Sequence, residues 1–200
     1  MKKDYFGQKA GTYETDGNRV SNVDNIANAI LERVRLDRGM HVMDFGSGTG
    51  LLLERIAPFV RKISAVDISK SMNAQLARKR DSLRCELDIL EIDLASQNLT
   101  AKFDVIISSM AMHHVQDTEA MFLKFYDLLN DEGIIAISDL DSEDGSFHTD
   151  DMGVHHCGFD REVIAAAASR ARFRDVELAD ASVVQKPQGS FPVFLLTAKR

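Results

Sequence analysis

Apolar residues follow two patterns that alternate along the chain, a spacing of three or four positions and short continuous runs. The first pattern predicts helices over residues 24–36, 49–60, 69–83, 118–129 and 160–170. Asp24, Ser69 and Asp160 stand at the starts of three of them, where a side-chain oxygen accepts a hydrogen bond from a free backbone N–H. Gly133 is expected to end the fourth helix, and Phe59 to lie on the buried face of the second.

The continuous apolar runs predict strands over residues 41–45, 63–66, 103–108 and 134–137. Alternation of apolar and polar residues predicts a further strand over residues 85–92, and two extended segments follow near residues 175–184 and 193–197. Strands that are apolar throughout and alternate with helices are typical of a parallel sheet covered on both faces. Residues 186–192, between the last two strands, are too few for a crossover helix, which predicts that those strands pair antiparallel. The expected fold class is α/β, with a doubly wound, mostly parallel seven-stranded sheet and an antiparallel C-terminal strand.

Length and charge narrow the class of protein. A chain of 200 residues is expected to form one domain, with an N-terminal arm and helix over residues 1–36. Its 24 basic and 31 acidic side chains give a net charge of −7, spread along the chain, which argues against nucleic acid as a partner. No apolar run is long enough to span a membrane, and no apolar core of a secretory signal follows Lys2 and Lys3. With only Cys85 and Cys157, no disulfide framework is expected, and the predicted location is cytoplasmic.

The most specific pattern is an Asp-x-Gly-x-Gly-x-Gly array over residues 44–50, between a predicted strand and a predicted helix. Glycines allow a tight turn and a close approach to a ligand, and a helix N-terminus supplies free N–H groups. Asp67 ends the next strand about 20 residues on, where a carboxylate can accept both hydroxyls of a ribose. A dinucleotide fingerprint would need a glycine at the position of Leu51, so the array disfavours an NAD-dependent oxidoreductase.

This array resembles that of the class I S-adenosylmethionine-dependent methyltransferases, in particular the small-molecule branch that includes the quinone-biosynthesis methyltransferases. The resemblance covers residues 37–140 in motifs, as a cofactor-binding core with the Rossmann-like methyltransferase fold, and the rest of the chain in element order. It implies S-adenosylmethionine as the cofactor. The implied contacts are Asp44, Gly46, Ser47, Gly48 and Gly50 at the methionine end, Asp67 at the ribose hydroxyls, Ile68 on one face of adenine, Asp93 and Leu94 at the adenine edge, and the backbone of Ser108 and Ser109 at the amino group.

Some of these residues also have ordinary interpretations. Asp44 and Asp67 are alternatively strand-end carboxylates that cap the next helix, and Ile68 is alternatively part of the core. The N-terminal arm is expected to place Tyr13, together with Arg19, over the cofactor.

Transfer of a methyl group needs a donor and an acceptor that are aligned and dry, so a catalytic side chain is optional. Where the acceptor carries a proton, a histidine is a suitable base near neutral pH. His114 follows the fourth predicted strand, and members of the resembled branch often carry a histidine there. His114 is the predicted catalytic residue, the alternative being an imidazole that only hydrogen-bonds the loop. His113 is expected to point elsewhere, because adjacent side chains diverge.

A polar loop over residues 139–158 is the predicted wall of the acceptor pocket. Phe147, His148, His155 and His156 are expected to line it. No zinc spacing joins these histidines with Cys157, so no metal is predicted. The loop carries acids at positions 139, 141, 143, 144, 150 and 151, which would favour neutral or cationic acceptors over anionic ones.

Two absences narrow the acceptor to a small molecule. Prolines stand only at positions 58, 187 and 192, which excludes the Asn/Asp-Pro-Pro-Tyr motif of amino-methylating nucleic-acid methyltransferases. Ser108 and Ser109 stand where catechol-type enzymes place a metal-binding aspartate. The predicted function is transfer of a methyl group from S-adenosylmethionine to a small-molecule acceptor. The alternatives are a catalytically inactive S-adenosylmethionine-binding regulatory or partner protein and, less favoured, an NAD-dependent oxidoreductase; the oligomeric state is left open.

Overall fold

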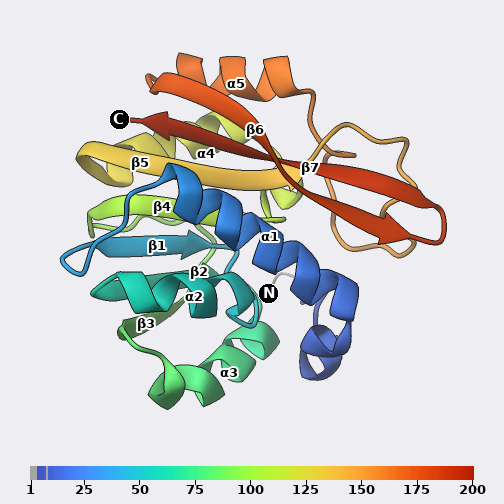
Figure 1. Ribbon diagram of the computed structural model, residues 1–200, viewed down its shortest axis with the longest axis horizontal. Coiled ribbons are helices and arrows are strands. Elements are labelled where there is room, and N and C mark those ends of the chain that lie inside the picture. Colours follow the sequence, from blue (N-terminus) through green and yellow to red (C-terminus); the bar gives the residue numbers. More distant parts are fainter. Residues whose placement is uncertain (1–3, 8) are drawn as a thin grey trace.

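The computed structural model describes residues 4–7 and 9–200, and its centre is a seven-stranded sheet in the order β3-β2-β1-β4-β5-β7-β6 (Figure 1). The strands are β1 His41–Phe45, β2 Lys62–Asp67, β3 Glu86–Glu91, β4 Phe103–Ser109, β5 Leu129–Leu140, β6 Arg174–Lys186 and β7 Gly189–Lys199. Strands β1 to β5 run parallel, whereas β7 pairs antiparallel with both β5 and β6. The predicted fold class is confirmed. The last two strands are longer than predicted, so that only residues 187 and 188 separate them.

Helices cover both faces of the sheet. They are η1 Ala10–Thr15, α1 Gly17–Arg33, α2 Leu51–Ile56, η2 Ala57–Phe59, α3 Lys70–Lys79, η3 Arg80–Ser82, η4 Met112–His114, α4 Thr118–Leu128 and α5 Arg161–Arg170, where η marks a 3-10 helix. Two predicted caps are present: Ser69 accepts a hydrogen bond from the Met72 N–H, and Asp160 accepts from Glu162 and Val163. Figure 1 shows α1 and α2 on the near side of the sheet and α4 on the far side.

Helix α1 begins earlier than the apolar spacing predicts. It starts at Gly17, and the Asp16 carboxylate caps it by accepting hydrogen bonds from N–H groups of the first turn. Asp24, the predicted cap, instead lies within the helix, where its Oδ1 accepts a hydrogen bond from Arg55 Nε at 2.6 Å. The first turns of α1 carry polar residues that face a cavity, so they lack the apolar periodicity on which the prediction depended.

Two other predicted features are wrong for local reasons. Helix α2 gives way to a 3-10 turn that contains Pro58, since proline cannot donate the next helical hydrogen bond, and Phe59 is left 45% exposed. Gly133 does not end a helix but lies within β5. The residue with a left-handed φ, 62°, is Glu132 immediately before it.

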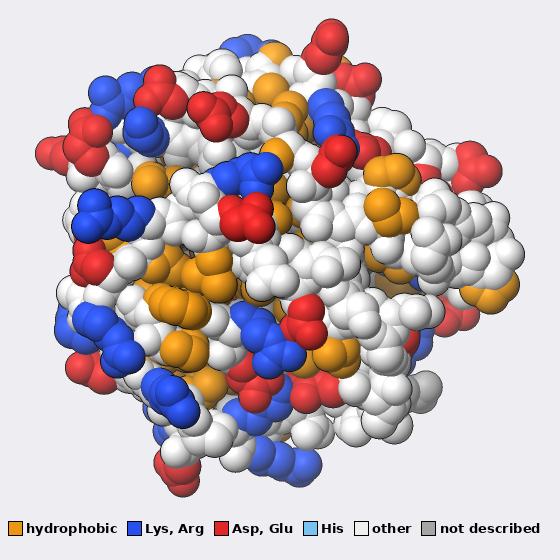
Figure 2. Space-filling model, in the orientation of Figure 1, with side chains coloured by type: hydrophobic (Ala, Val, Ile, Leu, Met, Phe, Trp, Pro, Cys, Tyr) orange, Lys and Arg blue, Asp and Glu red, His pale blue; other side chains and the backbone are white. Residues whose placement is uncertain are grey.

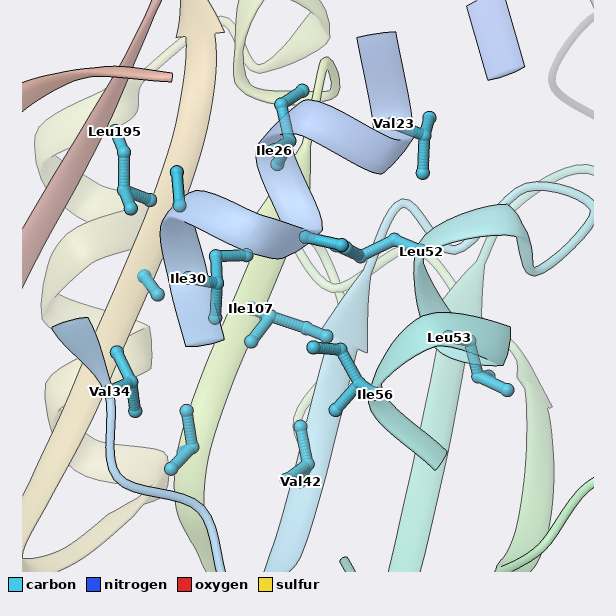
Figure 3. Packing of buried hydrophobic residues seen from close by; sticks show 14 of the residues in the cluster. Val23, Ile26, Ile30, Val34, Val42, Leu52, Leu53, Ile56, Ile107 and Leu195 are labelled. Atoms are coloured by element: carbon cyan, nitrogen blue, oxygen red, sulfur yellow. The ribbon is translucent and has the colours of Figure 1, made fainter. Parts of the chain in front are cut away.

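Two apolar clusters fill the space between the sheet and its helices. The first joins α1 and α2 to one face, and Figure 3 shows Ile30 and Ile56 directed toward the sheet. The second joins α4 and α5 to the opposite face, with the stripe of α4 made by Met121, Phe122, Phe125 and Leu128. Helical spacing predicts that stripe. Burying each such large side chain stabilises the fold by about 1.5–3 kcal/mol. The helices on both faces are therefore held firmly against the sheet.

Charged side chains of both signs are mixed on the face of the molecule that Figure 2 shows. On the face in Figure 2, Lys and Arg side chains lie among Asp and Glu side chains instead of forming one basic patch. In the described residues, no helix combines the length and the apolarity that crossing a membrane requires. The expectation that no secretory signal begins at Lys2 and Lys3 involves residues 1–3, which lie outside the described residues.

Candidate functional site

A cavity of about 250 Å³ opens at the carboxyl ends of β1 and β4. These strands are neighbours in space but not in sequence, and such a switch in strand order is where open α/β sheets bind ligands. Residues 46–49 form one wall of the cavity, and the start of α1 forms a second. The remaining walls come from residues that follow β4, from the loop around Phe147 and from the end of β6.

The glycine array makes the sharp turn from β1 into α2. Gly46, Gly48 and Gly50 have φ values of 71°, 53° and 86°, which residues with a Cβ rarely adopt. A Cβ on Gly46 would overlap that of Ala111, and one on Gly50 would come within 2.5 Å of Leu76 Cδ1. The space beside Gly48 is open. Gly46 and Gly50 therefore allow close packing behind the turn, whereas Gly48 leaves room beside it.

Asp67 ends β2 and holds the glycine turn. Its Oδ2 accepts a hydrogen bond from the Gly48 N–H at 2.8 Å, and its Oδ1 accepts one from the Ser69 N–H at 2.7 Å. Burial raises the pKa of this carboxyl above its usual value, against the effect of the two hydrogen bonds. The carboxylate therefore joins the turn after β1 to the start of α3.

Asp44 lines the cavity and is only 1% exposed. Its Oδ2 has no hydrogen-bond partner among the described residues. Burial, together with the nearby negative charge of Asp67, raises the pKa of the Asp44 carboxyl to about 8. A buried carboxyl oxygen without a partner is costly, which indicates a site shaped for a ligand with cationic or hydrogen-donating groups.

Unpartnered polar atoms gather at this cavity. Within the described residues, buried side-chain atoms that make no hydrogen bond occur on Asn22, Asp44, Ser47, Thr49, Asn73, Ser109 and His148. All of these residues except Asn73 line the cavity. Native proteins pair nearly all of their buried polar groups, so this concentration indicates a ligand that supplies the missing partners.

The cavity brings together some of the predicted cofactor residues and not others. Those that line it are Tyr13, Asp44, Gly46, Ser47, Gly48 and Ser109. Those outside its lining are Gly50, Asp67, Ile68, Asp93 and Leu94. Ile68 is 53% exposed, so the alternative that it belongs to the core is wrong. Asp93 accepts a hydrogen bond from the Ala95 N–H, and Leu94 is buried in the second apolar cluster.

His113, predicted to point away, lines the cavity together with His114. The two residues belong to the 3-10 turn η4, where adjacent rings need not diverge, and their ring centres lie 4.2 Å apart. His113 Nδ1 lies 2.7 Å from Asp139 Oδ1, and the His113 backbone N–H donates to Asp139 Oδ2 at 3.1 Å. The ring of His148 lies 5.0 Å from that of His113. The site thus holds three imidazoles, one of them fixed by a buried carboxylate.

His114 and His148 are neutral imidazoles at pH 7. Burial, followed by the proximity of His113, lowers the pKa of each ring to about 4. His114 Nδ1 lies 3.2 Å from the Gly153 carbonyl oxygen. A carbonyl oxygen can only accept, so Nδ1 carries the proton and Nε2 keeps a free lone pair. His114 therefore has the protonation state that a general base requires.

The loop over residues 139–158 supplies only part of the predicted wall. Phe147 and His148 line the cavity, whereas the prediction for His155 and His156 is wrong. The backbone N–H groups of these two residues donate to the His113 carbonyl, and the side chain of His155 is exposed. No group of three His, Cys, Asp or Glu side chains in the described part of the chain is arranged to hold a metal ion.

The N-terminal arm closes one side of the cavity. Tyr13 lines it, and the Arg19 guanidinium lies 4.0 Å from the centre of the Tyr13 ring. Phe6 packs edge-on against His114, with ring centres 5.8 Å apart. Asp4 accepts hydrogen bonds from two serine hydroxyls at the start of α3. The arm therefore contacts both the cofactor side and the histidine side of the site.

Two lysines line the cavity although no sequence pattern predicts them as site residues. Lys9, in the arm, forms an ion pair with Asp150 at 2.8 Å. Lys186, at the end of β6, donates a hydrogen bond to the Phe147 carbonyl, and its Nζ lies 3.6 Å from the centre of the Phe147 ring. Only the fold brings these lysines into the cavity that the glycine turn also lines.

Comparison with known proteins identifies the family. The model of a methyltransferase domain family matches residues 20–188. An uncharacterized methyltransferase of Schizosaccharomyces pombe is 28% identical over 169 residues, which cover 76% of this chain and 58% of that protein. An uncharacterized methyltransferase of Bacillus thuringiensis is 33% identical over 112 residues, which cover 55% of this chain and 51% of that protein. The chain thus spans little more than half the length of these relatives.

Solved structures share the fold at lower identity. The 4+2 cyclase SpnF has a TM-score of 0.73 at 17% identity, covering 88% of this chain and 80% of that one. Phosphoethanolamine N-methyltransferase 2 of Haemonchus contortus, in complex with phosphomonomethylethanolamine and S-adenosylhomocysteine, has a TM-score of 0.74 at 17% identity, covering 98% and 59%. Membership of the quinone-biosynthesis branch stays a prediction. The chain belongs to the methyltransferase family, and its fold is that of the class I S-adenosylmethionine-dependent methyltransferases.

Proposed function

We propose that the protein transfers a methyl group from S-adenosylmethionine to a small-molecule acceptor. The observation that carries the proposal is the convergence of unpartnered buried polar atoms on one cavity beside the glycine turn, with the Asp44 carboxyl among them. The cofactor has a cationic ammonium, a cationic sulfur and a ribose diol, which are the charges and donors that these atoms lack.

Two groups of residues would hold the two ends of the cofactor. Asp44 and the turn over residues 46–49 would hold the methionine end, and the backbone at Ser109 would meet the amino group. Asp67 and Ile68 follow β2, where they would hold the ribose and one face of adenine, with Asp93 and Leu94 at the adenine edge. The exposure of Ile68 supports this assignment, because about half of an apolar side chain is left uncovered directly after the carboxylate of Asp67.

The histidines would act on the acceptor. When bound, S-adenosylmethionine supplies a methyl group on a cationic sulfur, which the lone pair of an acceptor atom takes by in-line displacement. His114 receives the acceptor's proton at Nε2. Asp139 fixes His113 against the ring of His114, so His113 is a positioning residue. The loop over residues 139–158 and the N-terminal arm exclude water from the cavity.

Calorimetric titration tests the proposed cofactor. The protein is expected to bind S-adenosylhomocysteine and not NAD, because the glycine array lacks the third glycine of a dinucleotide fingerprint. Tight binding of NAD without binding of S-adenosylhomocysteine would overturn the proposal. A protein that binds S-adenosylhomocysteine and transfers no radiolabelled methyl group to any fraction of a metabolite extract would be the regulatory alternative.

Asp67→Ala is expected to weaken the binding of S-adenosylhomocysteine by roughly 1–3 kcal/mol, because charge-assisted hydrogen bonds to the ribose are lost. Asp88→Ala is the matched control, since Asp88 lies on the adjacent strand β3 and forms a surface ion pair with Lys62. Calorimetry on both variants measures the difference. An unchanged dissociation constant for Asp67→Ala would refute the ribose assignment.

His114→Ala is expected to lower the rate of methyl transfer by roughly 10²–10⁴-fold at saturating cofactor, because the general base is lost. The affinity for S-adenosylhomocysteine stays close to that of the wild type. His156→Ala is the control, since His156 bonds to the Val115 carbonyl outside the cavity. The assay follows radiolabel in the same extract fraction for all three proteins, and equal rates would reduce His114 to a structural residue.

A further inference from the structure

We propose that the methyl acceptor carries an anionic oxygen group, such as a carboxylate or a phosphate, and that Lys186 binds this group. The inference rests on the proposed function, because it assigns the chemical class of the acceptor in the same cavity. Lys186 lines the cavity but is not among the residues proposed to hold the cofactor.

Lys186 presents an ammonium that is only partly satisfied. The side chain is half-buried and lines the cavity. One of its three N–H groups donates to the Phe147 carbonyl, and the Phe147 ring lies beneath Nζ. Among the described residues, no carboxylate lies within 4.0 Å of Nζ to form an ion pair. Burial lowers the pKa of Lys186, which is the cost of this incomplete pairing.

The carboxylates whose charge acts on Lys186 make their short contacts with other groups. Those that act on its charge are Asp16 and Glu143. Asp16 caps α1 and lies 3.5 Å from Arg19 Nη2. Glu143 Oε2 accepts hydrogen bonds from the Gly145 and Phe147 N–H groups, at 2.8 and 3.0 Å. Both carboxylates therefore act on the ammonium only from a distance, and neither forms an ion pair with Lys186 Nζ.

Other charges around the cavity cancel in pairs. Lys9 is paired with Asp150, and Arg19 with Asp16. His114 and His148 are neutral at pH 7. An ionised Asp44 is balanced by the cationic cofactor. Among the described residues of the lining, Lys186 is the cationic side chain without a carboxylate partner, so an anionic group on the acceptor completes the site.

The acidic residues of the loop are bound to groups other than Lys186, although their number in the sequence suggests a pocket for neutral or cationic acceptors. Asp150 lines the cavity and is held by Lys9. Asp141 pairs with Arg161 at 2.7 Å, and Asp139 is bound to His113. Asp144, Asp151 and Glu143 accept hydrogen bonds from backbone N–H groups of the loop itself, namely those of Ser146, Gly153, Gly145 and Phe147.

A row of rings leads from Lys186 to the proposed base. The Phe147 ring lies 4.8 Å from that of His148, which in turn lies 6.2 Å from that of His114. The charge of Lys186 also helps to lower the pKa of His148, and both side chains lie against the Phe147 ring. An acceptor anchored at Lys186 therefore extends along Phe147 and His148 toward the proton-accepting His114, with its charge at one end and its reactive atom at the other.

Retention of small molecules by the protein tests the proposal. The acidic, neutral and basic fractions of a metabolite extract, separated by ion exchange at pH 7, are each incubated with the protein and S-adenosylhomocysteine, and bound compounds are identified by mass spectrometry after ultrafiltration. The wild type is expected to retain compounds from the acidic fraction, whose masses distinguish carboxylates from phosphates. Lys186→Met is expected to retain them at least about tenfold less, because a charge-assisted hydrogen bond is lost.

Two controls make the result specific. Lys186→Arg keeps the charge and is expected to restore most of the retention, and Lys199→Met, which breaks an exposed ion pair with Asp175 in the same hairpin, is expected to behave as the wild type. Retention of only neutral or basic compounds, equal retention by Lys186→Met, or retention of S-adenosylhomocysteine alone would overturn the inference and leave the proposed cofactor intact. Failure to retain S-adenosylhomocysteine would instead count against the proposed function.

Discussion

Asp44→Asn is expected to stabilise the free protein by roughly 2–4 kcal/mol at pH 7 while weakening the binding of S-adenosylmethionine. Burial holds the folded-state pKa of Asp44 at about 8, above its usual value of 3.8. Between these values the folded protein binds a proton that the unfolded chain has released, so the stability of the wild type falls as pH rises from about 4 to about 8. Asparagine resembles the protonated acid and removes that pH dependence.

The same carboxyl should couple cofactor binding to proton release. Because the cationic cofactor favours the ionised form, binding to the wild type at pH 7 is expected to release about one proton, and the dissociation constant rises up to tenfold for each pH unit below about 8. Calorimetry in two buffers with different ionisation enthalpies counts the proton, and urea denaturation across the same pH range measures stability. Equal proton release by Asp44→Asn, or a less stable variant, would contradict the assignment of Asp44.

Gly46→Ala is expected to destabilise the protein by roughly 2–5 kcal/mol and to abolish measurable cofactor binding. The left-handed φ of 71° accounts for part of this cost, and the overlap of the new Cβ with Ala111 accounts for the rest. Gly48→Ala isolates the first contribution, because its φ is also positive but the space beside it is open.

Removal of the opposing methyl group separates the two costs. In the double variant Gly46→Ala with Ala111→Gly, the overlap disappears. The double variant should therefore be more stable, by roughly 1–3 kcal/mol, than the sum of the two single effects predicts. Urea midpoints of the wild type, both single variants and the double variant complete the cycle. Additive effects would show that the two residues do not meet.

Apolar runs were enough to predict the central strands of the sheet, because strands buried on both faces need continuous hydrophobic sequence. The antiparallel pairing of the last two strands was predictable from their short connection, which leaves no room for a crossover helix. Asp44 and the glycines were predictable for another reason: a turn between a strand and a helix with left-handed backbone leaves a local signature. The start of α1 was not predictable in this way, because its polar residues face the cavity instead of the core.

The acceptor side of the site depends on contacts between distant parts of the sequence. His113 meets Asp139 only because β4 and β5 are adjacent in the sheet, and Lys186 reaches Phe147 only because β6 extends past the loop. No spacing rule relates such residues, since loop length and strand register decide whether they meet. The prediction for His113 failed for a smaller reason, namely a 3-10 turn where an extended chain was assumed.

The position of the N-terminal arm affects how the protein is best prepared for experiments. Asp4 accepts hydrogen bonds from Ser69 and Ser71 at the start of α3, beside the proposed cofactor site. Arg200 lies near the start of β5, at the opposite end of the parallel strands from the cavity, and its backbone N–H donates to the Gly133 carbonyl (Figure 1). An affinity tag attached after Arg200 therefore lies away from the cavity, whereas a change at Asp4 alters contacts beside the proposed cofactor site.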